Sequence, residues 1–302
     1  MHKHPFLLFF LCLFSSQTFS QGAGNDKASG DHKYGKGFHF GLFVGSLFAN
    51  KYSANLYDGY GLDADGFKNN FSNSEMARKI LFEYGGGNGL PDRIAPALNC
   101  NHSDWTFDET DMPASMTYNA AIMVGLQMRY GLTKNDAVIL NVNGSKLSVN
   151  GAFTIYVNNP SAVVSPTTDG PYRTFSIIGG EQRLVFQLGY QRLLGDVDKF
   201  NFFVEGGVTC TMAKFDKNLI NINGMIIDLT TYYNIYGNPE YHQKNLTGIG
   251  FGGFAGVGAN LNISPKWTVQ LVYDPSMEKI NIGAAPKYTL QHTAGLRAYY
   301  VF

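Results

Sequence analysis

Hydrophobic and polar positions alternate along the last stretch of the chain, Tyr288 to Phe302. One side of this stretch carries Tyr288, Leu290, His292, Ala294, Leu296, Ala298, Tyr300 and Phe302. Residues on the other side are mostly polar or small, with Thr289, Gln291, Thr293, Gly295 and Arg297 among them. A period of two residues predicts a β-strand with one apolar face.

Seven earlier segments alternate in the same way. The predicted strands cover residues 37–48, 118–131, 136–149, 181–194, 200–212, 248–263, 267–276 and 287–302. Every strand keeps polar residues on one face, so the apolar faces must point away from a common polar interior. The pattern predicts an all-β chain of eight strands.

The connections between these strands are sorted by length. Three are tight and polar, at 133–135, 195–199 and 264–266, and they alternate with long loops at 49–117, 150–180 and 213–247. Tight periplasmic turns, longer outer loops and an even strand number are the features of a transmembrane barrel. We therefore predict an eight-stranded antiparallel transmembrane β-barrel, residues 37–302, with long extracellular loops.

Composition agrees with a barrel and excludes two other classes of protein. Lys and Arg total 23 and Asp and Glu total 23, so the chain lacks the basic excess of a nucleic-acid binder. Beyond the N-terminal segment there is no run of about 20 apolar residues, which a membrane-spanning helix needs. With Gly 35, Tyr 18 and Phe 23, the chain suits strands that mix lipid-facing and lumen-facing residues.

The N-terminus predicts export from the cytoplasm. A basic start and the apolar run Phe6 to Phe14 indicate a signal peptide over residues 1–20. Residues 21–36 are rich in Gly, Asp, Ser and Lys, which predicts a flexible periplasmic lead-in. The expected location is the bacterial outer membrane, with both termini in the periplasm. Cys100 and Cys210 could pair or remain free thiols.

The lumen of an eight-stranded barrel is wide enough only for its own side chains. A polar channel or proton path is one interpretation of its inward polar residues. A packed network is favoured, because buried charges must be paired, and Arg129 and Arg297 are expected to lie near Glu205. The predicted lumen network comprises Arg129, Arg183, Glu205, Gln270 and Arg297.

The first long loop is expected to be partly folded. Ser72 to Glu75 has the spacing of a capping box, and Gly85 to Gly87 ends the helix that would follow. A second short helix is predicted over residues 91–98, with Pro91 in its first turn.

The long loops leave three alternatives open: a partner surface, a lid over the barrel mouth, and a calcium site at Asp58, Asp63 and Asp65 or at residues 104–111. That run packs four acids around two aromatics, but its spacing does not match an EF-hand, and no metal ligand is assigned. Tyrosine-rich polar loops are typical of binding surfaces. The candidate partner surface comprises Trp105, Phe107, Tyr232, Tyr233 and Tyr236.

The sequence gives little support for an enzyme. Outer-membrane barrels that act on lipids use a serine, a histidine and an acid near the outer leaflet. The segment starting at His292 is similar to the histidine motif of lipid A deacylases, but it lacks the serine two residues further on. We assign no catalytic residue and no cofactor.

The strands resemble those of the small outer-membrane barrels of Bacteroidota. This resemblance rests on a signal ending F-S-Q, the Gly/Asp/Lys lead-in, the eight strands and the terminal Y-Y-V-F, and it does not cover the loops. Barrels of this group include orphan surface proteins and accessory subunits of secretion (type IX among them) or gliding machinery. The expected function is a surface-exposed binding or accessory subunit of an envelope complex, with outer-membrane lipid and another envelope protein as partners. The alternatives are a small pore or ligand carrier, and a lipid-modifying enzyme.

Overall fold

A computed structural model of the chain describes residues 36–63, 65–158, 171–195, 199–231 and 246–301. The predicted signal peptide (1–20), nearly all of the lead-in (21–36), and Tyr232, Tyr233 and Tyr236 lie outside these ranges. Among the described residues, no helix is long and apolar enough to cross a membrane.

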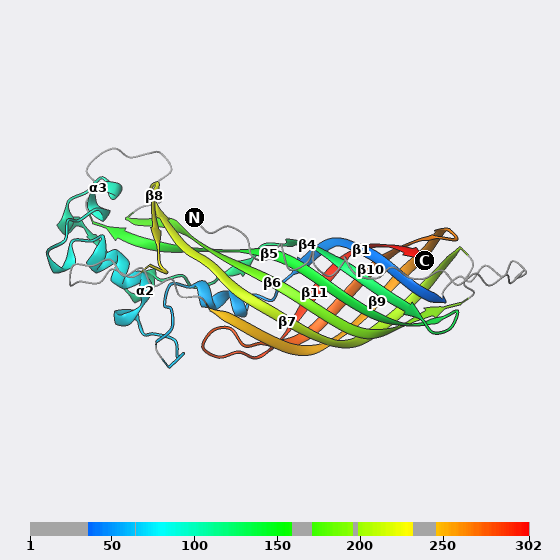
Figure 1. Ribbon diagram of the computed structural model, residues 1–302. Helices are drawn as coiled ribbons and strands as arrows, with labels where there is room; N and C mark the ends of the chain where they lie inside the picture. Colours follow the sequence, from blue (N-terminus) through cyan, green and yellow to red (C-terminus); the bar gives the residue numbers. More distant parts are fainter. Residues whose placement is uncertain (1–35, 64, 159–170, 196–198, 232–245, 302) are drawn as a thin grey trace, which may run out of the picture. The chain divides into compact units, whose positions relative to one another are not determined.

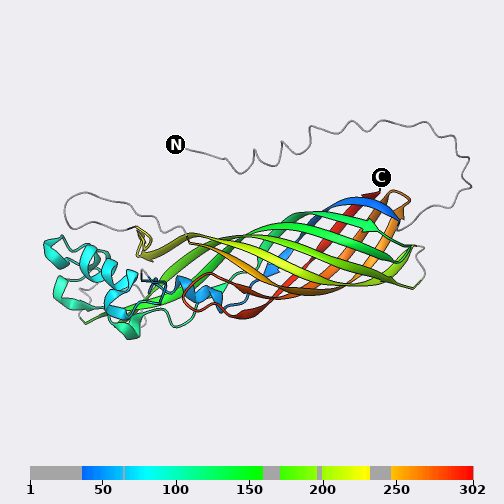
Figure 2. The ribbon, with the colours of Figure 1, turned by 60° about the horizontal axis from the view of Figure 1, so that its bottom comes forward.

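Eight strands close into an antiparallel ring, which confirms the predicted fold class (Figures 1 and 2). The ring closes where β1 pairs with β11 and β5 pairs with β6. Its strands are β1 (Gly37–Phe48), β4 (Ala121–Gly131), β5 (Asp136–Val157), β6 (Tyr172–Leu194), β7 (Phe200–Ile222), β9 (Thr247–Ser264), β10 (Trp267–Ile280) and β11 (Tyr288–Val301).

The two ends of the barrel differ, as the loop lengths predict. Short connections join β4 to β5, β6 to β7 and β9 to β10 at one end, where β1 also begins and β11 ends. We call this the tight-turn end and the opposite end the long-loop end. The predicted strand limits at the tight-turn end agree with the structure to within a residue or two, because there the alternation starts directly beside a polar turn.

An exposed apolar belt surrounds the barrel. Its outward-facing members include Leu42, Val44, Ile122, Leu188, Val208, Phe251, Leu271 and Leu296. A closed ring with a continuous apolar outer surface is what lipid requires, since every backbone polar group has a partner within the sheet.

Three strands extend well past their predicted ends at 149, 181 and 212, and these limits are corrected to 157, 172 and 222. The alternation continues there, but polar residues now face outward and apolar residues face inward. On β5 the outward residues from Lys146 onward are mostly polar, while the inward Leu147 and Val149 are buried. Lys146 pairs with Gln182 and Gln182 with Lys214, so the change occurs along one row of three strands. The outward faces leave the hydrocarbon at this row.

Beyond the belt, the extended strands carry a second folded part, which we call the long-loop unit. It consists of residues 50–118 together with the far ends of β5, β6 and β7 and the short strand β8 (Figure 1). Its other elements are η2 (Ser53–Tyr57), η3 (Phe71–Asn73), α2 (Glu75–Ala77), η4 (Arg78–Glu83), η5 (Gly87–Gly89), α3 (Ile94–Leu98), η6 (His102–Asp104), β2 (Trp105–Thr106), η7 (Glu109–Asp111), β3 (Thr117–Tyr118) and β8 (Met225–Asp228).

The long-loop unit has its own hydrophobic core. Side chains of the first long loop, such as Met76, Ile80 and Leu98, pack against the inward faces of the extended strands, including Ile155 and Ile220. Two short helical segments are present where they were predicted, but the second, α3, begins at Ile94, so Pro91 lies before its first turn and not within it. Ser74, rather than Ser72, caps α2, because its hydroxyl oxygen accepts a hydrogen bond from the backbone N–H of Ala77 (3.1 Å).

Candidate functional site

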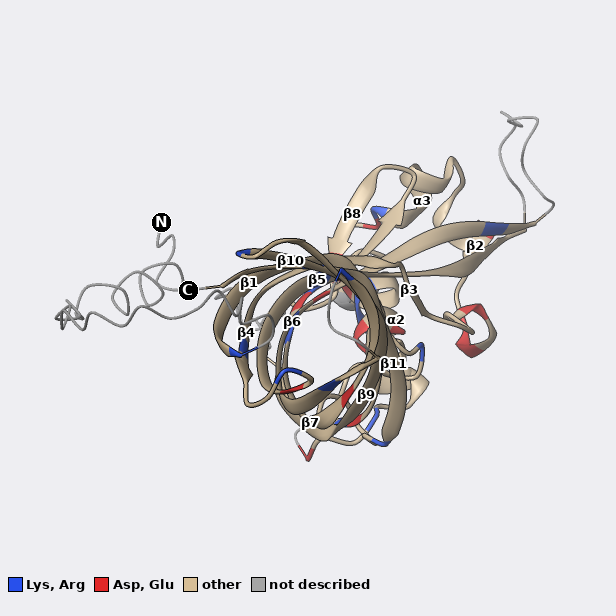
Figure 3. Cartoon of the chain, turned by 90° about the vertical axis from the view of Figure 1, so that its right-hand side faces the viewer, with Lys and Arg blue, Asp and Glu red and all other residues tan. Residues whose placement is uncertain are grey.

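The barrel lumen holds a network centred on Arg297. Its guanidinium donates to both carboxylate oxygens of Glu205 (2.8 and 2.7 Å) and to Asp274 (2.6 Å). Gln191 donates to Glu205 (2.7 Å) and lies within 3.3 Å of Gln270. These side chains are all buried, so a paired guanidinium and carboxylates cross the interior where a channel would run. Figure 3 shows the barrel viewed nearly along its axis, with acidic and basic residues coloured on the strands of the ring.

The five predicted lumen residues divide into three groups. Arg297, Glu205 and Gln270 lie in this first network. Arg183 belongs to a second cluster, nearer the long-loop end. Arg129 is buried on β4 opposite His39 of β1, and its Nε and Nη2 atoms have no hydrogen-bond partner among the described residues.

The second cluster closes the long-loop mouth. Arg183 donates from Nε to Glu181 (2.5 Å), and the Tyr118 hydroxyl donates to the same carboxylate (2.7 Å). Gln291 of β11 also accepts a hydrogen bond from Arg183 (3.3 Å), and the short helix η2 supplies two further groups. Ser53 accepts a hydrogen bond from Arg183 (3.2 Å), and the Tyr57 hydroxyl donates to Glu181 (3.2 Å). The first long loop therefore seals the barrel with a specific polar contact.

Tyr57 is the central side chain of this seal. Its ring is fully buried and stacks on Phe215, with 5.0 Å between ring centroids. The opposite wall is Gly179 on β6, where an added Cβ would lie 2.4 Å from the nearest ring atom of Tyr57. Glycine is required at this position because the ring occupies the space of a side chain.

The lumen between the two clusters is nearly solid. The cavity there has a volume of about 10 Å³, with Met123, Val185 and Glu278 in its lining, which is room for about one water. The Glu278 carboxylate accepts a hydrogen bond from Thr211 (2.5 Å).

We expect no stable conductance when the purified protein is inserted into planar bilayers, because two polar clusters and this packed segment block the interior. Single-channel recording at fixed voltage is the measurement. Reproducible current steps above the leak of protein-free bilayers would contradict the closed lumen.

The structure corrects the predicted partner surface at Trp105 and Phe107. These side chains are only 7% and 4% exposed, and both belong to the core of the long-loop unit. The acids around them serve the backbone, since Asp104 and Asp108 take part in capping boxes at η6 and η7. The acidic run 104–111 therefore forms two capped turns, η6 and η7, and its two aromatic side chains belong to the core of the long-loop unit.

Asp92 joins several parts of this unit. Its carboxylate accepts hydrogen bonds from the backbone of Ile94 (2.8 Å) and Ala95 (3.0 Å), from the Trp105 indole (3.2 Å) and from the His102 ring (2.5 Å between Nδ1 and Oδ2). Burial acts to raise the pKa of Asp92, but these hydrogen bonds outweigh it and hold the pKa below its usual range. The Asp92 carboxylate thereby satisfies two backbone N–H groups in the first turn of α3.

The other candidate chemistry has local partners. His292 faces outward on β11, where its ring hydrogen-bonds to the Tyr273 hydroxyl (2.7 Å). Cys100 and Cys210 are both free. Within the described ranges, no group of three or more His, Cys, Asp or Glu side chains could hold a metal ion.

These features define a closed transmembrane β-barrel with a filled lumen and a folded long-loop unit. No protein-family model and no curated protein matches the sequence. Among solved structures, the chain is similar to Neisserial surface protein A (7% identity over 88% of this chain and 98% of that one, TM-score 0.41). It is also similar to the outer membrane protein OprG of Pseudomonas aeruginosa (10% identity, 90% and 99%, TM-score 0.39). A third is Ail, the attachment invasion locus protein of Yersinia pestis (10% identity, 88% and 99%, TM-score 0.34). These similarities assign no residue and no activity to this chain.

Proposed function

We propose that this chain is an outer-membrane barrel that acts as a binding or accessory subunit of an envelope protein complex. In this proposal the long-loop unit faces the cell exterior and both termini lie in the periplasm. The proposed complex is of the kind that the sequence resemblance suggests, a secretion or gliding machinery. The lipid-facing belt has outer-membrane lipid as its second partner.

The observation that carries the proposal is the separate core of the long-loop unit. Ordering each residue costs roughly 1–2 kcal/mol of conformational entropy, and closing the barrel does not need about seventy ordered residues in one connection. Among the described residues, this core contains 23 buried hydrophobic side chains beyond the belt. A chain that only had to close its barrel would gain nothing from this unit.

The filled lumen supports the same proposal against a pore. The two polar clusters are tied to the barrel wall by charged hydrogen bonds, so solute passage would require breaking buried ion pairs. We propose no catalytic step, since His102 and His292 are engaged with Asp92 and Tyr273.

The partner contact is expected at exposed apolar side chains of the long-loop unit, because Trp105 and Phe107 are buried. Four candidates are Phe67 (67%), Ile226 (65%), Phe82 (45%) and Leu90 (39%). These side chains do not belong to the core of the unit, so substituting them should leave its fold intact.

Site-specific photocrosslinking in intact cells tests the proposal. A photoreactive residue at Phe82 or Ile226 should give a discrete protein adduct, and one at Lys134, in a tight turn at the other end, should not. Phe82→Ser or Ile226→Ser should then weaken co-purification of that partner about tenfold, the effect of losing about 1.4 kcal/mol. Absence of an adduct from all four exposed positions would refute the proposed binding role.

A further inference from the structure

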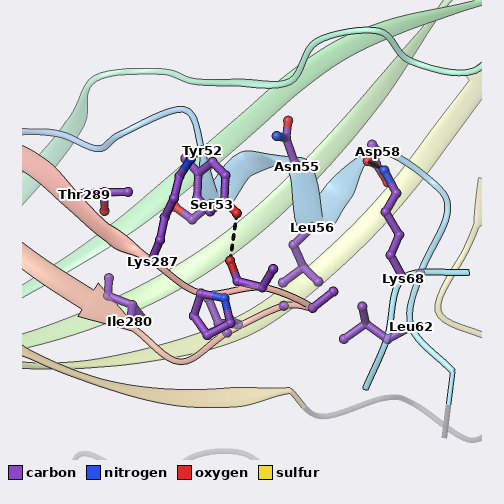
Figure 4. Close-up of a pocket in the computed structure, with 16 residues that line it drawn as sticks. Tyr52, Ser53, Asn55, Leu56, Asp58, Leu62, Lys68, Ile280, Lys287 and Thr289 are labelled. Carbon is purple, nitrogen blue, oxygen red and sulfur yellow. Dashed lines mark hydrogen bonds and ion pairs between the residues drawn. The ribbon is translucent and has the colours of Figure 1, made fainter. Parts of the chain in front are cut away.

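A cavity of about 200 Å³ lies outside the seal, between the chain around η2 and the connection from β10 to β11. Figure 4 shows its lining. Apolar side chains from both sides line it: Leu56 and Leu62 come from the first long loop, and Ile280 and Ile282 from the end of β10 and the residues after it. This site is independent of the proposed partner contact.

The polar part of the lining is electrically unbalanced. Asp58 is neutralised, because its carboxylate lies 2.6 Å from the ammonium of Lys68. Lys287 is held differently. Its ammonium lies 3.7 Å from the centre of the Tyr52 ring, and the Tyr52 hydroxyl donates to the carbonyl of Ala285 (2.8 Å). Within the described part of the chain, no carboxylate forms an ion pair with Lys287.

This arrangement places an ammonium that has no carboxylate partner among the described residues at the edge of an apolar cavity. A cation–π contact fixes its position and leaves its remaining N–H groups able to donate. An apolar cavity of about 150 Å³ is large enough to hold a benzene-sized molecule. A cavity of about 200 Å³ therefore suits a single ring or a medium-length alkyl chain.

We propose that this cavity binds a small amphipathic carboxylate. The apolar body of the ligand packs against Leu56, Leu62 and Ile280, and its carboxylate accepts hydrogen bonds from Lys287. A charge-assisted hydrogen bond of this kind strengthens binding by roughly an order of magnitude. The proposal gives the long-loop end a ligand site beside η2, the helix that seals the lumen.

The test uses the full-length mature protein in lipid nanodiscs, with octanoate as the probe and octanol as its uncharged counterpart. Titration calorimetry, with empty nanodiscs as the reference for partition into lipid, should show saturable 1:1 binding of octanoate. Octanol should bind about tenfold more weakly, because it lacks the carboxylate that would accept hydrogen bonds from the Lys287 ammonium. Equal affinities for the two probes would overturn the assignment of a carboxylate.

Two variants locate the site. Lys287→Gln should reduce octanoate affinity to that of octanol, whereas Lys134→Gln, which removes an equivalent charge at the tight-turn end, should leave it unchanged. Ala284→Phe, at an exposed position in the lining, should fill the cavity and abolish binding of both probes. Octanoate binding that survives both Lys287→Gln and Ala284→Phe, or no saturable binding to the unmodified protein, would refute the proposal.

Discussion

Replacing Arg297 by methionine should lower the free energy of unfolding of the barrel by about 3–5 kcal/mol. The substitution removes the guanidinium that donates to Glu205 and Asp274. Two buried carboxylates would then lose the only guanidinium that hydrogen-bonds to both of them among the described residues, and burying an unpaired charge is far more costly than losing an exposed ion pair.

Glu205→Gln is the informative companion. Arg297 would keep Asp274 as a charged partner at 2.6 Å, so the expected loss is smaller, about 1–3 kcal/mol. This ordering of the two variants follows from the geometry, in which one arginine serves two acids.

The two tryptophans of the chain allow the measurement to be made separately for each part. Trp267 lies in the exposed belt of β10, and Trp105 lies in the core of the long-loop unit. Guanidinium unfolding from lipid vesicles, followed by Trp267 fluorescence in a Trp105→Phe background, reports on the barrel. Arg192→Gln is the control, because that side chain is 61% exposed and lies 3.8 Å from Asp136; its loss should stay below about 1 kcal/mol. Equal effects at Arg297 and Arg192 would contradict the buried network.

The strands of the barrel were predictable from the sequence because lipid imposes a strict rule on them. Outward residues must be apolar within the belt, and the lumen of a small barrel accepts polar side chains, so β4 and β10 have clear alternation. Loop lengths added the end-to-end asymmetry. The fold class followed from these two patterns alone.

The same rule does not hold in the long-loop unit, so the strand extensions there were not predicted. Past Lys146 the outward face of β5 meets water and the inward face meets a protein core, so the alternation continues with opposite polarity. The pattern of polar inward and apolar outward residues ends at this point, so the sequence predicts a loop over residues 150–157, where the structure has strand. The missed extensions include Phe153 and Ile155, whose spacing of two residues continued the strand.

The partners within the lumen were only partly predictable. Glu181 is the first residue of the predicted strand 181–194 and is not among the predicted lumen residues, yet it is the acid that pairs with Arg183. Whether Arg129 meets a carboxylate depends on the stagger of neighbouring strands around the ring, and alternation within single strands does not determine that stagger. Sequence prediction has a similar limit in the loops. The composition around Trp105 and Phe107 predicts exposed binding residues, but the neighbouring acids cap two turns and both aromatic side chains are buried in the core of the long-loop unit.

The second large effect is expected at Tyr57, which links the long-loop unit to the barrel. Tyr57→Ala should destabilise the unit by about 3–5 kcal/mol, because a fully buried ring is lost between Phe215 and Gly179. Trp105 fluorescence in a Trp267→Phe background is the readout. The unfolding midpoint seen by Trp267 in a Trp105→Phe background should change much less, since the Arg297 network does not contact this ring.

Gly179→Ala should also destabilise the long-loop unit, because Gly179 lies against the Tyr57 ring on the side opposite Phe215. Its new Cβ would lie 2.4 Å from the Tyr57 ring, so the ring must shift or the strand must move, at a cost of about 1–3 kcal/mol. The double variant separates this mechanism from a general weakness of β6: once Tyr57 is alanine, the clash is gone and Gly179→Ala should be nearly neutral. A coupling free energy of about 1–3 kcal/mol in the double-mutant cycle is therefore expected. Simple additivity of the two losses would mean that Tyr57 does not occupy the space above Gly179, and the seal of the lumen would have to rest on Arg183 and Glu181 without it.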